Sequence, residues 1–363
     1  MTFEAVAEQN EAKRLLSAAL AEGPAHAYLL HGPPGVGKRD VALLFAAELL
    51  GEHTRVERRT HPDLYVLEPV GDQIRIDDIR GLRRDLHMRP FEAARRVYLV
   101  FGADTMNEDA ADALLKDLEE PPSYAVIVLV ASDLGPLPET IRSRCQLVPF
   151  RRLSEPAVRE EIRRRAPDLP DDEVTTLARA AAGRLDRAAR LLDPAAASRR
   201  ESLLAVARAV YLDADFDAGD GAQALLEGIA ERGAEAKENA EDAVAVLELS
   251  GREAEQRVRR AQRGAERDEL LAALEELEWW YRDLVVLAAG AESAVVHVDR
   301  LDELRADATR DRSQGAERAC EHLRAAWREA EELQLSVPLA LEALLVRLRR
   351  ELAGSGRSRV STL

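Results

Sequence analysis

A glycine-rich segment near the start of the chain, His31–Arg39, carries the residues best suited to bind a phosphate group. It follows the apolar run Ala27–Leu30 and precedes an apolar, helix-like segment, Val41–Leu50. Glycines let the backbone turn so that its N–H groups converge on an anion, and the positive end of the following helix strengthens that field. The sequence therefore predicts a phosphate-binding loop made of Gly32, Pro33, Pro34, Gly35, Val36, Gly37, Lys38 and Arg39.

Two groups that nucleotide hydrolysis needs are missing from the sequence. In a complete loop of this kind a Ser or Thr follows the lysine and binds the magnesium ion, but here Arg39 takes that place. The predicted strand Val97–Phe101 ends without the acidic residues that hold magnesium and activate water, and Asp104 follows beyond the strand end. We therefore expect at most weak binding of ATP or ADP, no magnesium site, and an ATPase activity that is absent or very weak.

A second candidate for chemistry is the arginine of the segment Thr140–Cys145, which is predicted to be a loop just before a short strand. Arg144 could be an ordinary surface residue in an ion pair, or a finger offered to a nucleotide that a neighbouring subunit holds. Such fingers contribute roughly 10³ to 10⁵ in rate, because a desolvated guanidinium meets charge that develops only in the transition state. The motif alone leaves both interpretations open.

The composition indicates a soluble protein of two or three domains, with 363 residues of which 46% are apolar and 33% charged. The net charge of −16 argues against a surface that wraps a polyanion, so we expect partner proteins to be the main contacts. No run approaches the ~18 apolar residues of a membrane span, and the chain starts without a basic signal segment. We expect a cytoplasmic location and no membrane contact.

Only two cysteines occur, Cys145 and Cys320, which is too few for a disulfide framework or a cysteine-rich zinc site. His53 and His61 lie in the polar segment before the second predicted strand, and two histidines alone make a weak argument for a metal. We therefore predict two free thiols and no metal ligands.

The elements that must position these residues alternate between strands and helices over the first 150 residues. This alternation predicts an α/β fold with a five-stranded parallel sheet covered on both sides. The predicted strands are 27–30, 63–67, 97–101, 126–130 and 146–150. The helix predicted over 74–87 has a basic face, which is either a solvated surface or a phosphate contact, formed by Arg75, Arg80, Arg83 and Arg84.

The remainder of the chain reads as helical. Three short helices are predicted over 154–165, 172–182 and 184–192, and helical patterns continue from 195 onward. Gly219–Gly221 is the clearest break in that region, and 235–278 is a long, strongly charged stretch. Its basic part, 252–267, is best interpreted as a solvated helix stabilised by ion pairs one turn apart.

Four segments together resemble the clamp-loader subunits of bacterial DNA polymerase III, in particular those of the delta-prime type. They are Gly32–Lys38, His61–Asp63, Ala113–Pro122 and Thr140–Cys145. The Leu-Leu-Lys run that ends in Leu-Glu-Glu-Pro-Pro, followed at this distance by Ser-Arg-Cys, makes the resemblance specific. The family is of the AAA+ type and implies a nucleotide-binding core (1–151), a helical lid (152–195), an all-α collar that oligomerises (196–353) and a disordered tail (354–363).

The resemblance also implies a role in DNA replication as an accessory subunit of the DNA polymerase III holoenzyme. Arg144, positioned by Ser143 and Cys145, would complete the ATP site of an adjacent motor subunit. The implied partners are motor subunits of the gamma/tau type, a delta-type clamp-opening subunit and, through the assembled complex, the sliding clamp and primer-template DNA. The alternative is an ATP-hydrolysing motor subunit of the gamma/tau type.

The sequence departs from the family pattern at three places. The usual cysteine cluster before His61 is absent, so no zinc is expected. Glu8 stands where the family usually has glycine. In the predicted lid, Asp186 aligns with the position of a phosphate-sensing arginine in motor subunits, and a carboxylate there would repel a phosphate.

Overall fold

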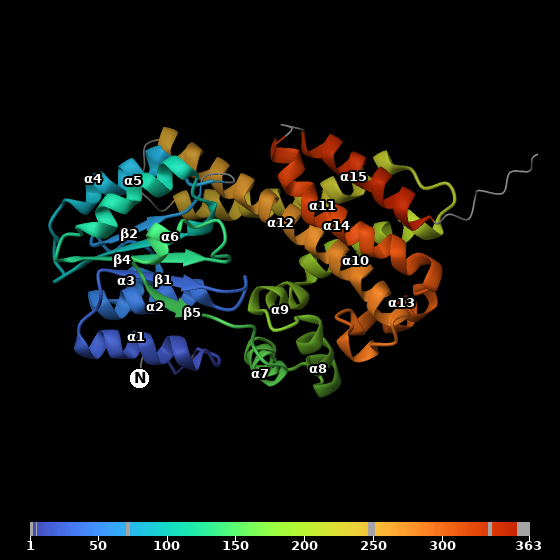
Figure 1. The fold of residues 1–363 in the computed structure, drawn as a ribbon, viewed down its shortest axis with the longest axis horizontal. Helices are drawn as coiled ribbons and strands as arrows, with labels where there is room; N and C mark the ends of the chain where they lie inside the picture. Colours follow the sequence, from blue (N-terminus) through green and yellow to red (C-terminus); the bar gives the residue numbers. More distant parts are fainter. Residues whose placement is uncertain (1–2, 5, 70–72, 246–250, 333–335, 354–363) are drawn as a thin grey trace, which may run out of the picture. The chain divides into compact units, whose positions relative to one another are not determined.

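In the computed structural model the chain divides into two compact units, which are Met1–Ala189 and Arg190–Leu363 (Figure 1). The structure describes residues 3–4, 6–69, 73–245, 251–332 and 336–353. The predicted tail, 354–363, lies outside the described residues. The boundary between the units falls within the last of the three predicted lid helices, so contacts group most of the lid with the sheet.

The first unit is built on a five-stranded sheet in the order β2-β3-β4-β1-β5, and the paired strands are parallel. This confirms the predicted α/β fold. All five strands fall within one residue of the predicted ranges, and β3 and β4 are buried along their whole length. The strands are β1 (Ala27–His31), β2 (Leu64–Leu67), β3 (Arg96–Phe101), β4 (Ala125–Ala131) and β5 (Gln146–Pro149).

Helices cover both faces of this sheet, as parallel connections require. One face packs against α1 (Asn10–Glu22) and α2 (Lys38–Leu50), and the other against α4 (Ile76–Leu86) and α5 (Glu108–Glu119), as Figure 1 shows. Alternate residues of β1 divide between the two cores: Tyr28 lies with the first pair of helices and Leu29 with the second. Because both faces of the sheet are packed, the strands hold the loops at their ends in fixed positions.

Three short helical segments differ from the sequence-based expectations. The polar segment before β2 contains α3 (His53–Glu57), and a turn of 3₁₀ helix, Ala103–Thr105, follows β3. The segment predicted as a loop at Thr140–Cys145 begins as α6 (Glu139–Arg142). Each is too short to show a recognisable apolar period, which explains why the sequence did not reveal them.

The lid contains α7 (Glu155–Arg165), α8 (Asp171–Ala180) and α9 (Leu185–Leu192). The hydroxyl of Ser154 accepts a hydrogen bond from the N–H of Ala157, which caps α7 as the Ser-x-Pro start predicts. Asn107 caps α5 in the same way by accepting from the N–H of Ala110.

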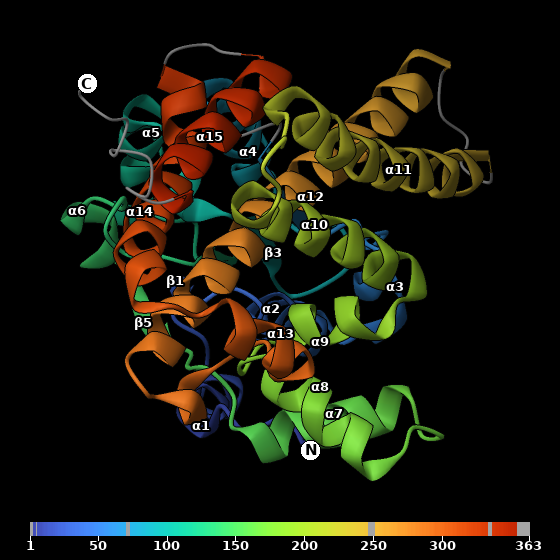
Figure 2. The ribbon, with the colours of Figure 1, turned by 90° about the vertical axis from the view of Figure 1, so that its right-hand side faces the viewer.

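The described residues of the second unit form helices joined by short loops, and α11 and α12 run alongside each other (Figure 2). Its helices are α10 (Pro194–Leu212), α11 (Ala218–Ala245), α12 (Gly251–Ala288), α13 (Leu301–Asp307), α14 (Arg310–Glu332) and α15 (Val337–Leu352), with 3₁₀ turns at Glu292–Ala294 and Val298–Arg300. Trp280 and Tyr281 of α12 are fully buried in its core.

The break predicted at Gly219–Gly221 lies slightly earlier, at 213–217 between α10 and α11, and the glycines themselves belong to the first turn of α11. The carboxylate of Asp217 accepts hydrogen bonds from the N–H groups of Gly219 and Asp220, so it acts as the cap that starts the helix. The long charged stretch predicted over 235–278 belongs to α11 and α12, and residues 246–250 between them lie outside the described residues.

Candidate functional site

The predicted phosphate-binding loop connects the end of β1 at His31 to the start of α2 at Lys38. Gly32 and Gly37 have φ angles of 135° and 88°, a region that favours glycine. A Cβ on Gly32 would lie 2.2 Å from the backbone oxygen of Phe150, so no side chain fits there. Loop and helix therefore adopt the strand–turn–helix arrangement that the glycine spacing predicts.

Lys38 is turned onto the loop's own carbonyl groups. Its Nζ donates to the oxygens of Gly32 and Pro33, both at 2.6 Å, and the residue is only 6% exposed. Burial lowers the pKa of Lys38 to about 8, although the carboxylates of Asp104 and Asp186 oppose that shift. A phosphate bound in this loop would have to draw the ammonium group away from two hydrogen bonds.

The two positions where the sequence departs from a hydrolytic site lie in contact. The guanidinium carbon of Arg39 lies 4.3 Å from the ring centroid of Phe101, a cation–π distance, and Glu68 pairs with the same guanidinium. Arg39 occupies the position where a hydroxyl would bind magnesium, and Phe101 occupies a position where an acid would hold magnesium or activate water. In the sequence these two replacements are far apart, whereas in the structure the side chains of Arg39 and Phe101 pack against each other.

Asp104, the nearest acid after β3, is tied to the end of β4. Its Oδ2 accepts hydrogen bonds from the N–H groups of Ser132 and Asp133, both at 3.0 Å. These hydrogen bonds connect the loops that follow the neighbouring strands β3 and β4, so the Asp104 carboxylate stabilises the contact between the two loops.

Arg144 follows α6 and lies half-buried at the surface, with 34% of its side chain exposed. Its Nη2 donates to Oε1 of Glu119 at 2.5 Å, and its Nη1 donates to the oxygen of Thr140 at 2.9 Å. Ser143 donates its hydroxyl to the same oxygen at 3.1 Å. The motif Leu-Glu-Glu-Pro-Pro and the motif Ser-Arg-Cys, which are about 25 residues apart in the chain, thus meet in one ion pair.

Cys145 is buried beneath the sheet with α5 and α6. Burial raises the pKa of its thiol to about 12, so the sulfur stays protonated and unreactive at neutral pH. Cys145 directly precedes β5 and follows Ser143 by two residues.

His61-Pro62-Asp63, which the sequence marks only through resemblance, shapes the loop before β3. The fully buried carboxylate of Asp63 accepts three backbone hydrogen bonds, from Phe91 at 2.6 Å, Glu92 at 2.9 Å and Ala93 at 2.8 Å. Burial by itself would raise the pKa of Asp63, but the three donors outweigh it and hold the pKa below the ordinary value. An Asp directly before a strand does not by itself indicate that its carboxylate binds a distant loop. The sequence therefore did not reveal the hydrogen bonds that Asp63 accepts from residues 91–93.

One trio of side chains brings metal-ligating atoms within 4.8 Å of one another: Glu52, His61 and Glu92. Nδ1 of His61 accepts the N–H of Asp63 at 3.1 Å, which leaves the proton of a neutral imidazole on Nε2, the atom that faces Glu92 at 3.4 Å. Arg55 donates to both carboxylates, at 3.1 Å and 2.6 Å. A cation there would have to displace a guanidinium and a proton, so the geometry favours an ion-pair network.

The basic face predicted on α4 lines a groove of about 290 Å³, formed by Arg80, Arg83, Arg84 and His87. Arg83 is also paired with the buried carboxylate of Asp117, at 2.7 Å between Nε and Oδ2. The groove concentrates positive charge on one helix of a chain that is acidic overall.

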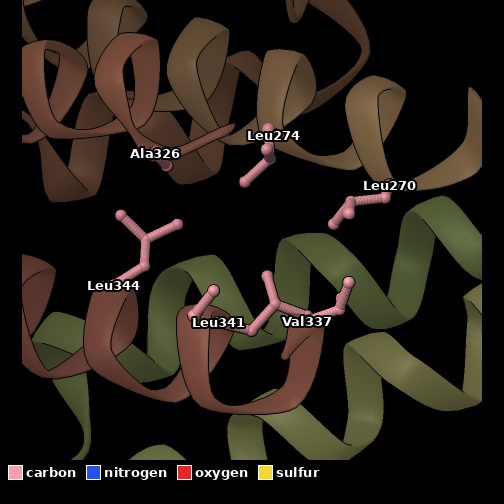
Figure 3. Close-up of a pocket in the computed structure, with 7 residues that line it drawn as sticks. Leu270, Leu274, Ala326, Val337, Leu341 and Leu344 are labelled. Carbon is pink, nitrogen blue, oxygen red and sulfur yellow. The ribbon is translucent and has the colours of Figure 1, made fainter. Parts of the chain in front are cut away.

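The helical unit contains an apolar cavity of about 20 Å³ between α12, α14 and α15, shown in Figure 3. Its lining is entirely aliphatic: Leu270, Leu274, Ala326, Val337, Ala340, Leu341 and Leu344. A space of this size holds about one water molecule and offers no polar partner, so it is a packing defect and no ligand site.

Among the described helices, none is long and apolar enough to cross a membrane.

The first unit thus combines a five-stranded parallel sheet, a glycine-rich loop between β1 and α2, and three short helices that follow the sheet. Residues 8–154 match the family model described as DNA polymerase III, delta subunit. Over these residues the chain is therefore similar to clamp-loader subunits of DNA polymerase III, including subunits named delta'.

Individual relatives agree with the family match. The DNA polymerase III subunit delta' of Bacillus subtilis is 35% identical over 149 residues, which are 38% of this chain and 45% of the relative. The subunit delta' of Pseudomonas aeruginosa is 40% identical over 136 residues, 33% of this chain and 42% of the relative. The subunit tau of Bacillus subtilis is 29% identical over 168 residues, which are 43% of this chain and 30% of the relative. The chain spans less than half the length of these relatives.

Proposed function

We propose that this chain is a delta-prime-like subunit of the DNA polymerase III clamp loader. It hydrolyses little or no ATP itself and supplies Arg144 to a nucleotide held by an adjacent motor subunit of the gamma/tau type. Through the assembled complex, which includes a delta-type clamp-opening subunit, it takes part in loading the sliding clamp onto primed DNA. The helical unit serves as the collar that holds the ring together.

The observation that carries this proposal is the contrast between the two candidate sites. At the chain's own loop, Lys38 is bound to backbone carbonyls and Arg39 is stacked on Phe101, so both cations are already engaged. Arg144 is held at the surface by a partly exposed ion pair with Glu119. Such a pair contributes about 0–1 kcal/mol, so a phosphate from another subunit can replace the carboxylate at little cost.

The experiment that tests the proposal is the ATPase activity of a clamp loader reconstituted with this chain. Arg144→Ala should lower ATP turnover while the complex still assembles, because the variant removes only the group that stabilises the transition state. Arg163→Ala is the matched control, since Arg163 also forms a surface ion pair, with Asp171 in the lid. Equal turnover of the Arg144 variant and the control would refute the finger.

The motor subunit is the second candidate, because the loop keeps its glycines and Lys38 and because a tau subunit is among the relatives. The isolated chain distinguishes the two. Steady ATP turnover that Lys38→Ala abolishes would establish a motor and end the first proposal. For the proposed subunit, a thermal-shift titration with ATP or ADP should show a small shift that magnesium does not increase.

A further inference from the structure

The start of α9 lies directly on the phosphate-binding loop. The N–H of Leu185 donates to the backbone oxygen of Gly35 at 2.7 Å. The carboxylate of Asp186 packs against the same residue so closely that a Cβ on Gly35 would lie 1.7 Å from Oδ1. Gly35, with φ of 70°, is thus required both by the turn and by the approach of the lid.

The carboxylate of Asp186 is held in place by neighbours within the lid. Arg184 donates from Nε to Oδ1 at 3.1 Å and from Nη2 to Oδ2 at 2.7 Å, and the N–H of Arg187 donates to Oδ1 at 2.8 Å. Burial opposes ionisation, but the Arg184 guanidinium and the backbone donor outweigh it and keep the pKa of Asp186 below its ordinary value. A fixed negative charge therefore faces the loop.

This charge lies close enough to Lys38 to interact with it electrostatically. A nucleotide phosphate in the loop would meet a second anion where a motor subunit would present a cation, and like charges at short range repel strongly away from bulk water. The phosphate would also compete with the two carbonyls that already bind Lys38. Both effects act against an anionic ligand.

The other end of the lid is fastened without a ligand as well. The side-chain amide of Gln9 donates to the oxygen of Arg151 at 2.7 Å and accepts the N–H of the same residue at 3.1 Å. Glu8 accepts the N–H of Ser154 at 3.0 Å, at the start of α7. Glu8 and Gln9 adopt φ angles of 49° and 47°, which explains why glycine suits position 8 and shows that Glu8 compensates through its carboxylate.

We infer that Leu185 and Asp186 form a latch that holds the lid on the phosphate-binding loop when no nucleotide is present, and that the latch keeps nucleoside di- and triphosphates out. The inference concerns the chain's own loop and does not depend on a role for Arg144. It adds to the missing magnesium and water-activating groups a separate reason for weak nucleotide binding: an intramolecular anion stands against the loop.

The first test measures backbone hydrogen exchange in the full chain without nucleotide. The amide of Leu185 should be protected in the wild type, and Asp186→Ala should speed exchange both at 184–188 and at the loop, 32–38. Glu160→Gln removes an exposed acid of α7 in the same lid and should change neither segment. Unprotected exchange of Leu185 in the wild type, or identical exchange in the Asp186 variant, would overturn the latch.

The second test titrates ADP, without magnesium, into the same proteins by calorimetry. Asp186→Asn keeps the size of the side chain and removes its charge, so ADP should bind at least tenfold more tightly than to the wild type. Adding Lys38→Ala to that variant should abolish the gain, and Glu160→Gln should match the wild type. A gain that survives Lys38→Ala, or no gain from Asp186→Asn, would show that the latch does not exclude nucleotide.

Discussion

The ion pair between Arg144 and Glu119 allows two opposite perturbations of one contact. If the arginine acts on a neighbour's nucleotide, Arg144→Ala and Glu119→Ala should have different effects on ATP turnover although each breaks the same pair. The first removes the group that stabilises the transition state. The second frees that group from a competing carboxylate 2.5 Å away.

The expected magnitudes follow from exposure and from the chemistry of phosphoryl transfer. The side chains of the pair are 34% and 49% exposed, so either variant should change the free energy of unfolding by about 1 kcal/mol or less. An arginine finger contributes roughly 10³ to 10⁵ in rate, or about 4–7 kcal/mol of transition-state stabilisation. Catalysis and stability should therefore respond on very different scales.

The assay is single-turnover ATP hydrolysis in the reconstituted complex, because only the site next to this chain depends on Arg144. Arg144→Ala should nearly abolish the phase that belongs to that site, and Arg144→Lys should not restore it, since an ammonium lacks the planar donor fork. Glu119→Ala should leave the phase unchanged or faster. The reasoning fails if the Glu119 variant loses activity as the Arg144 variant does, because the pair would then act as a structural unit.

Other expected outcomes concern the framework of the two units. Asp63→Ala should destabilise the chain by about 2–4 kcal/mol in urea unfolding, because it leaves buried N–H groups without an acceptor. The folded-state pKa of Asp63 lies below its unfolded value, so the stability lost in this variant should be constant above about pH 4 and should shrink as the pH falls below it. Burial raises the thiol pKa of Cys145 to about 12 and of Cys320 to about 11, so a thiol reagent at pH 8 should label neither cysteine in the folded chain and both after denaturation. Trp280→Phe should cost about 1–3 kcal/mol, since the indole N–H of Trp280 donates to the hydroxyl of Tyr211 inside the helical core at 3.2 Å, and urea unfolding followed by circular dichroism measures this loss.

Short-range patterns predicted the framework well. Apolar runs located the strands because a parallel sheet buries its strands on both faces, as β3 and β4 do here. The glycines after β1 predicted the loop, since only glycine adopts the φ angles found at positions 32 and 37 without strain. The cap that Asn107 provides for α5 likewise depends on a residue only three positions away. The break predicted at Gly219–Gly221 lies a few residues earlier, at 213–217, because the Asp217 cap lets the glycines start α11.

The sequence by itself determined which groups the chain carries: a lysine in a glycine loop, an arginine in place of the magnesium-binding hydroxyl, no acid at the end of β3, and an arginine between Ser143 and Cys145. Only the tertiary structure decided which of these groups meet. Arg39 stacks on Phe101, Asp186 packs on Gly35, and Arg144 pairs with Glu119, each across a separation of 25 residues or more. Periodicity and local propensity report on neighbours one or two turns away, whereas the partner of a charged side chain is chosen by the fold, which brings distant segments within a few ångströms.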